Sequence, residues 1–287
     1  MDDCLDIWGF SIPLRCLSLD DIHYIKSLPT SLPDVKWVWG ELDRVWAEYG
    51  LDNKRELKGQ SIAEYYRHPV WLINGIFTAL DIESKSHRAS MAKFFSFLDL
   101  VQIADYGGGF GELALAITRF SPKARVSIIE PYPSKIGIER ISGETRIEFS
   151  ETLARSRFDV AIAQDVLEHV EDPIGLAYEL ADAVKINGYI VFANCFSPVI
   201  QCHLPSTFHL RHTFPWVMGC IGLSFVGNIP GASHVQVFKK CGRLDLEGGR
   251  KAEAWSRKLR PISAFVGPLT SYARKRLKSI DNPEKLL

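Results

Sequence analysis

A glycine-rich stretch after a short apolar run constrains this chain more than any other feature. Residues 101–106, Val-Gln-Ile-Ala-Asp-Tyr, have the composition of a buried strand, glycine fills four of the five positions 107–111, and a helical pattern begins at Glu112. Glycine lets the backbone turn sharply and lie against a ligand, and a helix start offers unpaired N–H groups. The stretch therefore predicts a strand, a tight loop and a helix that together bind a nucleotide-like cofactor, with Asp105 accepting a hydrogen bond from an ammonium or hydroxyl group.

The spacing of these glycines separates two classes of cofactor. The dinucleotide fingerprint G-x-G-x-x-G/A requires a small residue at its sixth position, where the helix packs on the strand beside a pyrophosphate. Counted from Gly107, the sixth residue is Glu112, which is bulky and negatively charged. An NAD(P)-dependent oxidoreductase is therefore the disfavoured alternative.

Further apolar runs alternate with helical patterns and also end in polar residues. Residues 125–129 lead into Glu130, residues 146–150 lead into Glu151, and residues 158–163 lead into Gln164 and Asp165. Alternation at this spacing predicts an α/β fold, a doubly wound parallel sheet that binds ligands at the carboxyl ends of its strands. Glu130 lies about twenty residues beyond the glycines, where such folds place a carboxylate on the ribose hydroxyls. Asn187-Gly188 is expected to end the helix that starts at Pro173.

Two motifs give the chain a resemblance to a known family. Residues 105–111 read D-x-G-x-G-x-G, which resembles motif I of the class I S-adenosylmethionine-dependent methyltransferases. Residues 165–173, D-V-L-E-H-V-E-D-P, resemble the fourth motif of the small-molecule type, the methyltransferase type 11 group that includes the ubiquinone-biosynthesis O-methyltransferases. The resemblance covers roughly residues 98–241 and implies a Rossmann-like, seven-stranded, mostly parallel sheet with an antiparallel last strand.

The resemblance also implies a cofactor, S-adenosyl-L-methionine, and a set of residues that hold it. Asp105 with the loop glycines would surround the methionine moiety, Glu130 with the following proline the ribose, and Gln164 with Asp165 the methionine and sulfonium. Gly108 adds flexibility beyond the family pattern, and the third motif, which would place Glu151 on the adenine, is weak here. The expected cofactor-binding residues are Asp105, Gly107, Gly108, Gly109, Glu130, Pro131, Glu151, Gln164 and Asp165.

The methyl acceptor is expected to meet the loop after the fifth strand, where the family places its acceptor-binding segment. A hydroxyl acceptor needs a base, and histidine is the natural base near neutral pH. The candidates are His209, His212 and His203, in that order, with Arg211 holding a carboxylate or phosphate of the substrate. Tyr65 and Tyr66 are further candidates for acceptor binding. The predicted activity is methyl transfer to a small molecule or a glycan, at a hydroxyl oxygen.

Two other functional readings stay open. Asp165, Glu168 and His169 have the acid-x-x-acid-His spacing by which some methyltransferases hold a divalent metal, with a later histidine completing the site. The same string occurs in many relatives that bind no metal, so we expect none here. A non-catalytic cofactor-binding module that recruits a partner or a membrane through its tail is the alternative from another class.

Composition and charge set the remaining bounds. The 287 residues carry a formal net charge of zero, which gives no reason to expect a sequence-specific nucleic-acid partner. Six scattered cysteines without a C-x-x-C pair favour free thiols in the cytoplasm. We predict a helical N-terminal region that lids the pocket (1–98), a methyltransferase domain (99–241) and a basic amphipathic extension (242–287). Residues 250–278 of that extension are also compatible with peripheral contact to the inner face of a membrane.

Overall fold

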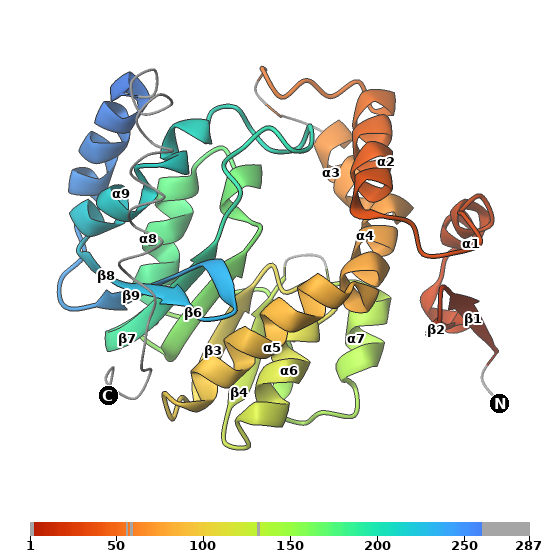
Figure 1. Ribbon diagram of the computed structural model, residues 1–287, viewed down its shortest axis with the longest axis horizontal. Helices are drawn as coiled ribbons and strands as arrows, with labels where there is room; N and C mark the ends of the chain where they lie inside the picture. Colours follow the sequence, from red (N-terminus) through yellow and green to blue (C-terminus); the bar gives the residue numbers. More distant parts are fainter. Residues whose placement is uncertain (1–2, 56, 58–59, 131–132, 260–287) are drawn as a thin grey trace.

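A seven-stranded sheet forms the centre of the protein. The computed structural model describes residues 3–55, 57, 60–130 and 133–259 (Figure 1). The strand order is β5-β4-β3-β6-β7-β9-β8, and the first five of these strands are parallel. Strand β9 pairs antiparallel with both β7 and β8. The strands are β3 (Gln102–Tyr106), β4 (Arg125–Ile129), β5 (Ile147–Ser150), β6 (Phe158–Gln164), β7 (Val184–Ala193), β8 (Leu223–Ile229) and β9 (Ala232–Lys240). The predicted fold class, with a mostly parallel sheet and an antiparallel strand near its end, is confirmed.

The order of the strands positions the ligand site. From β3 the chain moves outward through β4 to β5, then returns to the other side of β3 to form β6 and β7. The gap between β3 and β6 is therefore the topological switch point, where α/β sheets bind their ligands. Tyr106 at the end of β3 is level with Ile129 of β4 and Ala163 of β6. The residues that follow these strands thus meet at one edge of the sheet.

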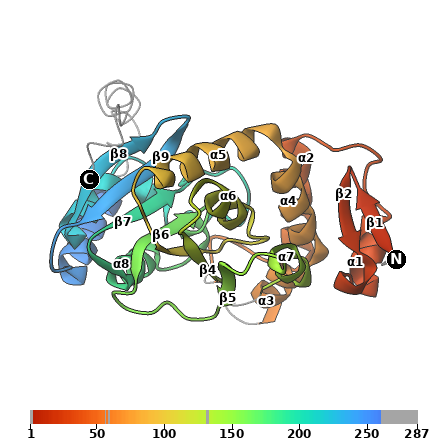
Figure 2. The same ribbon diagram turned by 90° about the horizontal axis from the view of Figure 1, so that it is seen from below.

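Helices cover both faces of the sheet (Figure 2). Alternation along each strand sends side chains to opposite faces, so Ile103 packs under α5 and α6 while the neighbouring Ala104 packs under α8 and α9. The smaller helix α7 lies beside β5. The bounds are α5 (Ile82–Ser96), α6 (Glu112–Phe120), α7 (Lys135–Ile141), α8 (Pro173–Ala183) and α9 (Phe214–Ile221).

The N-terminal region is mainly helical but begins with a β-hairpin that the sequence analysis did not predict. Ile7 pairs with Phe10 across a two-residue turn, Trp8-Gly9, in which both residues have positive φ. Such turns match the twist of the two strands that they join. The elements are β1 (Cys4–Ile7), β2 (Phe10–Pro13), the 3-10 helix η1 (Leu14–Cys16), α1 (Leu19–Ile25), α2 (Val35–Glu48), α3 (Gln60–Arg67) and α4 (Pro69–Leu80).

Phe110 joins this N-terminal region to the glycine-rich loop. Its ring is buried among side chains of β2, α4 and α7, 6.3 Å from the ring of Phe10. A Cβ added to Gly75 of α4 would lie 2.6 Å from the Phe110 ring, so the helix and the loop fit against each other closely. The predicted role of residues 1–98 as a lid stays a prediction, and this contact is the physical link that such a role requires.

Replacing Phe110 by alanine should destabilise the protein and loosen the loop. Removing a buried phenylalanine from a packed core costs about 3–5 kcal/mol in free energy of unfolding. Phe120→Ala is the matched control, because that ring is 48% exposed and its loss should change stability by about 0.5 kcal/mol or less. Urea unfolding of both variants measures the difference. Equal stabilities would contradict the packing of the N-terminal region on the loop.

The chain continues past β9 into a helix over 246–259, which docks on the sheet domain instead of extending from it. Ala252 is buried beside α9, Arg250 forms an ion pair with Asp172 at the start of α8, and Ser256 Oγ donates to the His209 carbonyl at 2.9 Å. The predicted domain boundary at residue 242 therefore does not coincide with a change in packing. The rest of the predicted extension, 260–287, lies outside the described residues.

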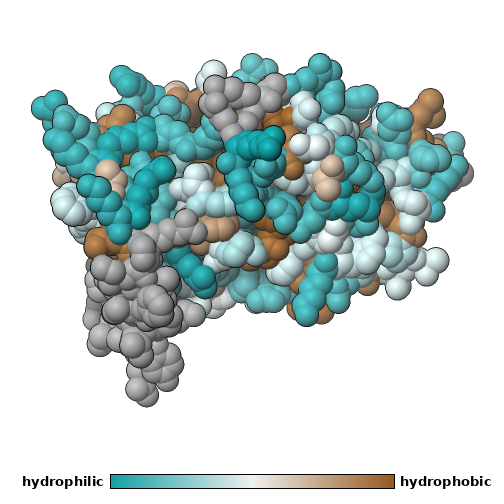
Figure 3. Space-filling model, turned by 90° about the horizontal axis from the view of Figure 1, so that it is seen from above, coloured by the Kyte–Doolittle hydropathy of each residue, from teal (hydrophilic) through white to brown (hydrophobic). Residues whose placement is uncertain are grey.

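Every helix within the described residues is too short or too polar to cross a bilayer. The face seen in Figure 3 is largely hydrophilic, with smaller hydrophobic areas between the charged side chains. On the described part of the C-terminal helix, the basic residues have partners on the protein: Lys251 pairs with Glu247, Arg257 with Glu253, and Lys258 lies over the ring of Trp255.

Candidate active site

The glycine-rich loop is folded as the sequence predicts. The backbone angle or the space around the Cα atom explains why glycine occupies positions 107, 108 and 109. Gly107 has a φ of +71°, and a Cβ there would lie 2.8 Å from Val166 after β6. A Cβ on Gly108 would lie 2.6 Å from Asp105 Oδ2. Gly109 has a φ of +54° with open space around its Cα. The loop thus closes against the protein at its first two glycines and leaves room for a ligand at the third.

Asp105 lies beneath this loop in a buried position. Its side chain is 2% exposed, and Oδ2 has no hydrogen-bond partner among the described residues. Burial raises the pKa of Asp105 to about 7, and the nearby charge of Glu130 contributes to the same shift. A buried carboxyl group with an unused oxygen at a ligand site can accept a hydrogen bond from a bound amine or hydroxyl group.

The raised pKa of Asp105 predicts a pH-dependent stability. In the unfolded chain this group loses its proton near its ordinary value of 3.8, whereas the fold holds the proton up to about pH 7. The folded state therefore binds more protons in this window, and its contribution to stability is lost as pH rises from about 4 to 7. Asp105→Asn should remove this loss, so its stability advantage over the wild type should grow by about 2 kcal/mol between pH 5 and 7 and then stay level.

Urea unfolding of both proteins across this pH range, without cofactor, measures that advantage. An advantage that is the same at pH 5 and pH 7 would contradict the assignment of a shifted pKa to Asp105.

The other predicted cofactor residues gather at the same edge of the sheet. Half-buried Glu130 follows β4, and its backbone N–H donates to the Ser150 carbonyl at 3.2 Å, which joins the ends of β4 and β5. Glu151 follows β5 and is exposed. Gln164 is the last residue of β6, across the switch point from the glycine loop. Pro131 lies outside the described residues.

Asp165 has a strained backbone at the end of β6. Its φ is +52°, which is uncommon for a residue with a side chain, and such strain concentrates at functional sites. Its N–H donates to the Ala193 carbonyl at 2.7 Å, which fixes the turn to the end of β7. The residue is exposed to solvent. The protein atoms around its carboxyl group displace part of the hydration of the charged form, and this desolvation raises the pKa of Asp165.

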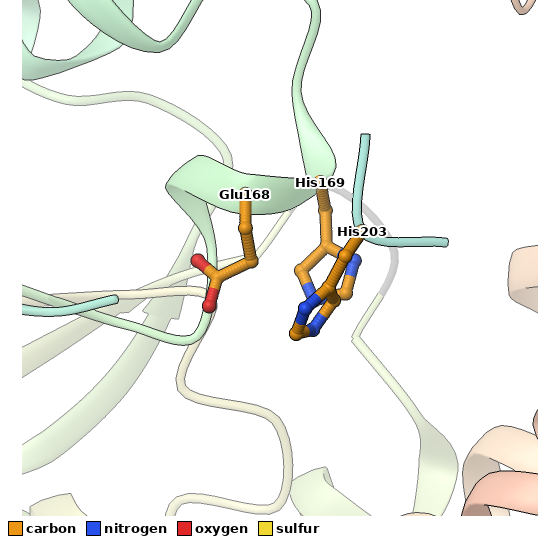
Figure 4. Close-up of side chains that lie close together, drawn as sticks. All are labelled: Glu168, His169 and His203. Atoms are coloured by element: carbon orange, nitrogen blue, oxygen red, sulfur yellow. The ribbon is translucent and has the colours of Figure 1, made fainter. Parts of the chain in front are cut away.

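Three titratable side chains converge next to this turn (Figure 4). Glu168 and His169 lie on the 3-10 helix η2 (Leu167–His169), and His203 lies in the loop after β7. One carboxylate oxygen of Glu168 and one ring nitrogen of each histidine all lie within 4.8 Å of one another. We call Glu168, His169 and His203 the convergent triad. The metal alternative named Asp165, Glu168 and His169 with a later histidine; the structure groups Glu168 and His169 with His203 and leaves Asp165 outside this cluster.

Hydrogen bonds fix the orientation of each member of the convergent triad. Glu168 Oε1 accepts from the Cys195 N–H at 2.6 Å, and Oε2 is buried without a partner among the described residues. Nδ1 of His203 lies 2.9 Å from the Ser197 carbonyl, and Nδ1 of His169 lies 3.1 Å from the Cys202 carbonyl. A carbonyl only accepts, so Nδ1 carries the proton in both rings and Nε2 is left to accept one.

The surroundings of the convergent triad favour its uncharged forms. Burial lowers the pKa of His169 to about 3, with His203 adding to the shift, and burial also lowers the pKa of His203. Burial raises the pKa of Glu168, as does the neighbouring Asp165. Three side chains that can each accept a hydrogen bond thus face one another. A hydroxyl group of the methyl acceptor can give its proton to such a side chain.

Aromatic residues of the N-terminal region flank the convergent triad. The ring of Trp71 lies 6.3 Å from that of His169, and Tyr66 lies 5.1 Å from Trp71. Tyr66 is 38% exposed, and burial, Cys202 and then Glu168 raise its pKa. Tyr65 is different, because it is completely buried in the core between α2, α3 and α4. Tyr66 therefore stays a candidate for acceptor binding, and Tyr65 does not.

The structure separates the three predicted histidine bases. His209 on the 3-10 helix η3 (Phe208–Arg211) is 3% exposed, and its Nε2 lies 3.5 Å from Glu253 of the C-terminal helix. His209 thus faces the C-terminal helix, and its role as the first candidate base stays a prediction. His212 is half-buried, and burial and Arg211 lower its pKa. Arg211 is exposed, and its charge acts on Cys195 next to Glu168.

Sequence reasoning missed a second pair of histidines near Asp165. His87 of α5 and His234 of β9 have ring centroids 4.6 Å apart, and the charge of His87 acts on Asp165. The two residues lie 147 positions apart in sequence, and neither belongs to a motif. Only the pairing of β9 with β7, which sets Val235 opposite Ala193, brings His234 to the carboxyl edge of the sheet.

The chain is similar to known methyltransferases in sequence pattern and in fold. Residues 84–219 match the family model of a methyltransferase domain, and none of the curated protein sequences matches the chain. Among solved structures, an O-methyltransferase family protein from Burkholderia thailandensis is similar at 15% identity and a TM-score of 0.50, over 72% of this chain and 70% of that chain.

Two other solved structures are similar at lower scores. Mitomycin 7-O-methyltransferase has 18% identity and a TM-score of 0.49 over 70% of this chain and 66% of that chain. Human N-acetylserotonin methyltransferase, solved with S-adenosylmethionine, has 16% identity and a TM-score of 0.46 over 71% of this chain and 66% of that chain.

The strand order and the glycine loop are those expected of a methyltransferase, and residues 84–219 match the model of a methyltransferase domain. The cofactor of this class is S-adenosyl-L-methionine, and the NAD(P)-dependent alternative is set aside. The residues present fit that cofactor, because the glycine loop has open space at Gly109 and Asp105 beneath the loop carries a buried carboxyl oxygen without a partner among the described residues.

Proposed function

We propose that the protein transfers a methyl group from S-adenosyl-L-methionine to a hydroxyl oxygen of a small-molecule acceptor, with His203 as the general base. The single observation that carries this proposal is the convergent triad beside the switch point. It supplies proton-accepting atoms at the turn after β6, which the glycine loop approaches closely at Gly107. When bound, the cofactor supplies an activated methyl group, so the protein mainly has to align the acceptor and remove its proton.

His203 takes the place of His209 as the preferred base. The bond between its Nδ1 and the Ser197 carbonyl leaves Nε2 to take a proton, and its ring lies 4.8 Å from that of His169. His169, with a pKa near 3, is a poor base at neutral pH. Glu168 lies beside both rings, and its Oε2, which has no partner among the described residues, can accept a hydrogen bond from the imidazolium that forms when His203 accepts the proton.

The acceptor would lie between the convergent triad and the N-terminal region. Tyr66 with Trp71 offers an aromatic wall, while Arg211 and His212 offer polar contacts from η3 and the residue after it. A glycan hydroxyl satisfies the same chemistry as a small-molecule hydroxyl. The membrane contact proposed for residues 250–278 now rests on 260–278, because the described basic residues of the C-terminal helix have partners on the protein.

A divalent metal is the competing use of the convergent triad. One carboxylate oxygen and two imidazole nitrogens form a donor set that several transition metals accept. We favour the base, because transfer to a hydroxyl group needs a proton acceptor and Nε2 of His203 supplies one. Chelation separates the two uses. Dialysis against EDTA should leave turnover unchanged, and a loss that added divalent cation restores would assign the triad to a metal.

Transfer of labelled methyl groups from S-adenosylmethionine into fractionated host extract tests the proposal. We expect label in a small-molecule or glycan fraction, in a form that resists the mild base which hydrolyses methyl esters. Label found in protein or RNA, or on a carboxyl group, would contradict the proposed acceptor. Cofactor binding that leads to no transfer into any fraction would favour the non-catalytic binding module.

A further inference from the structure

Four rings form a continuous row from the N-terminal region to the proposed base. The ring of Tyr66 on α3 lies 5.1 Å from that of Trp71 on α4, and Trp71 lies 6.3 Å from His169. The ring of His169 lies 4.8 Å from that of His203. Figure 4 shows the two imidazole rings at the end of this row, with the carboxylate of Glu168 beside them. We call Tyr66, Trp71, His169 and His203 the aromatic row.

Tyr66, at the far end of the row, has accessible surface in a place that protein surrounds. The residue is 38% exposed, yet burial is the main cause that raises the pKa of its hydroxyl group, followed by Cys202 and Glu168. Asp165 shows the same combination, because it is exposed while desolvation raises its pKa. The charge of Asp165 also acts on Glu168. Both accessible side chains thus lie around the same carboxyl group, and Tyr66 offers its ring to a molecule bound beside the convergent triad.

The wall behind Tyr66 is apolar. Trp71 and Ile200 are partly buried and pack against the core between α2, α3 and α4. The ring of Tyr65, which is completely buried in that core, lies 5.2 Å from the ring of Tyr66. A polyhydroxylated ring placed here would lose water from its hydroxyl groups, which costs free energy unless each of them finds a new partner. A flat aromatic ring instead gains apolar contact and ring packing, so the wall favours an aromatic acceptor.

The base at the other end of the row favours an acidic hydroxyl group. Histidine ordinarily has a pKa of about 6.5, and burial lowers the pKa of His203. A phenol has a pKa of about 10, whereas an aliphatic hydroxyl group is about as weak an acid as water, at about 15.7. Proton transfer to a general base becomes easier as the pKa of the donor approaches that of the base. His203 is therefore better matched to a phenol than to a sugar or another aliphatic alcohol.

We propose that the methyl acceptor is a phenol, whose ring lies against Tyr66 and Trp71 and whose hydroxyl group points to His203. The phenolic O–H gives its proton to Nε2 of His203. The oxygen forms a bond to the methyl carbon while the bond from that carbon to sulfur breaks, and the electron pair of the broken bond stays on sulfur. The products are an aryl methyl ether and S-adenosylhomocysteine, and His203 then releases its proton to solvent. The proposal rests on the proposed function for His203 as the base.

Substitution of Tyr66 tests the placement of the ring. With the acceptor recovered from host extract, Tyr66→Ala should raise KM at least about tenfold and change kcat by less than about threefold, because the ring binds the acceptor and takes no proton. Tyr66→Phe keeps the ring and should keep KM within about twofold of the wild type. Phe97→Ala is the matched control, since that ring is 36% exposed but precedes β3 at the opposite edge of the sheet, and KM should not change.

Two kinetic results would overturn this placement. One is an unchanged KM in Tyr66→Ala. The other is a KM in Tyr66→Phe that rises as much as in Tyr66→Ala, which would assign acceptor binding to the hydroxyl group of Tyr66 and not to its ring. Binding of S-adenosylmethionine, measured on the same samples, should be unchanged in all three variants.

Equilibrium dialysis with naphthol tests the ring site without methyl transfer. In the presence of S-adenosylhomocysteine, the wild type should bind naphthol with a Kd below about 1 mM. Decahydronaphthol has the same carbon skeleton without aromatic rings, and it should bind at least about tenfold more weakly. Tyr66→Ala should lose most of this preference, and Phe97→Ala should keep it. Equal binding of the two probes by the wild type, or no saturable binding of naphthol, would overturn the proposal.

The chemical class of the methylated product gives an independent test. Labelled product from host extract should be an aryl methyl ether, with the ultraviolet absorbance of an aromatic ring. Raising the pH should shift the absorbance of the acceptor, which ionises, and leave that of the product unchanged. A product that is the methyl ether of a sugar or another aliphatic alcohol would overturn the phenol while leaving the proposed methyl transfer intact. Absence of any labelled product would contradict the proposed function, and the dialysis result would then still decide the ring site.

Discussion

His203→Ala is expected to lower kcat about 10²–10⁴-fold while the affinity for S-adenosylmethionine stays within about twofold of the wild type. The variant removes the proton acceptor but leaves the glycine loop and the residues at the ends of β4 and β6 in place. Because the loss falls on a proton transfer, the remaining activity should rise with pH as the acceptor hydroxyl ionises in solution. Steady-state kinetics from pH 6 to 9 and calorimetric cofactor binding measure both effects.

His209→Ala is the matched control for this prediction. His209 is also a buried histidine of the same loop, but it contacts Glu253 of the C-terminal helix and lies outside the convergent triad. We expect this variant to lose stability, since it leaves Glu253 buried without that partner, and to keep its kcat within about threefold when folded. The opposite result, with activity lost in His209→Ala and kept in His203→Ala, would restore the ranking that the sequence alone favoured.

Gly109→Val should weaken the binding of S-adenosylmethionine by more than about 100-fold. A β-branched residue at a φ of +54° is strained by about 1–2 kcal/mol, and its side chain would occupy the open space above the loop. Gly143→Val is the control, because Gly143 is exposed, has no positive φ and has open space around it. Equal cofactor affinity in the two variants would contradict the placement of the ligand at the glycine loop.

The same Gly109 variant separates an enzyme from a binding module. A methyltransferase should lose turnover together with cofactor binding. A module that recruits a partner should keep that partner when the cofactor no longer binds. Methyl transfer and partner capture measured with the same variant therefore give opposite patterns for the two functions.

The cofactor half of the site could be predicted from sequence because its signals are local. Gly107 and Gly109 have positive φ angles, which glycine adopts without a steric penalty. The amino-acid sequence alone therefore indicates a sharp turn at these positions. Asp105 lies near the end of β3, Glu130 follows β4, and Gln164 with Asp165 stands at the end of β6, so each polar residue comes after a run of strand-forming residues. In a parallel sheet such ends meet at one edge, so their meeting there follows from the pattern of strands and helices.

The acceptor half could not be predicted in the same way, because it depends on how distant elements pack. His203 and His209 are six residues apart in one irregular loop, and nothing in the sequence tells which of them faces the sheet edge. His209 instead faces a helix over 246–259, and His203 faces η2, which precedes it by more than thirty residues. His87 and His234 likewise meet only through the pairing of β9 with β7.

Two local expectations were wrong for identifiable reasons. Asn187-Gly188 was expected to end the helix that starts at Pro173, but α8 ends at Ala183 and both residues lie within β7. The pairing of β6 with β7 shifts register between Phe158 and Val160, and this irregularity accommodates the positive φ of Asn187. At the N-terminus, the Trp8-Gly9 turn joins β1 and β2 in a hairpin, whereas a helical region was predicted over residues 1–98.

A crystal structure with S-adenosylhomocysteine, the product of methyl transfer, tests the central claim most directly. The account predicts that the cofactor lies at the switch point between β3 and β6, against Gly107 and Gly109, with Glu130 on the ribose hydroxyls. Its sulfur should face the space in front of Glu168 and His203. A cofactor bound at another edge of the sheet, or one whose sulfur faces away from the convergent triad, would contradict it.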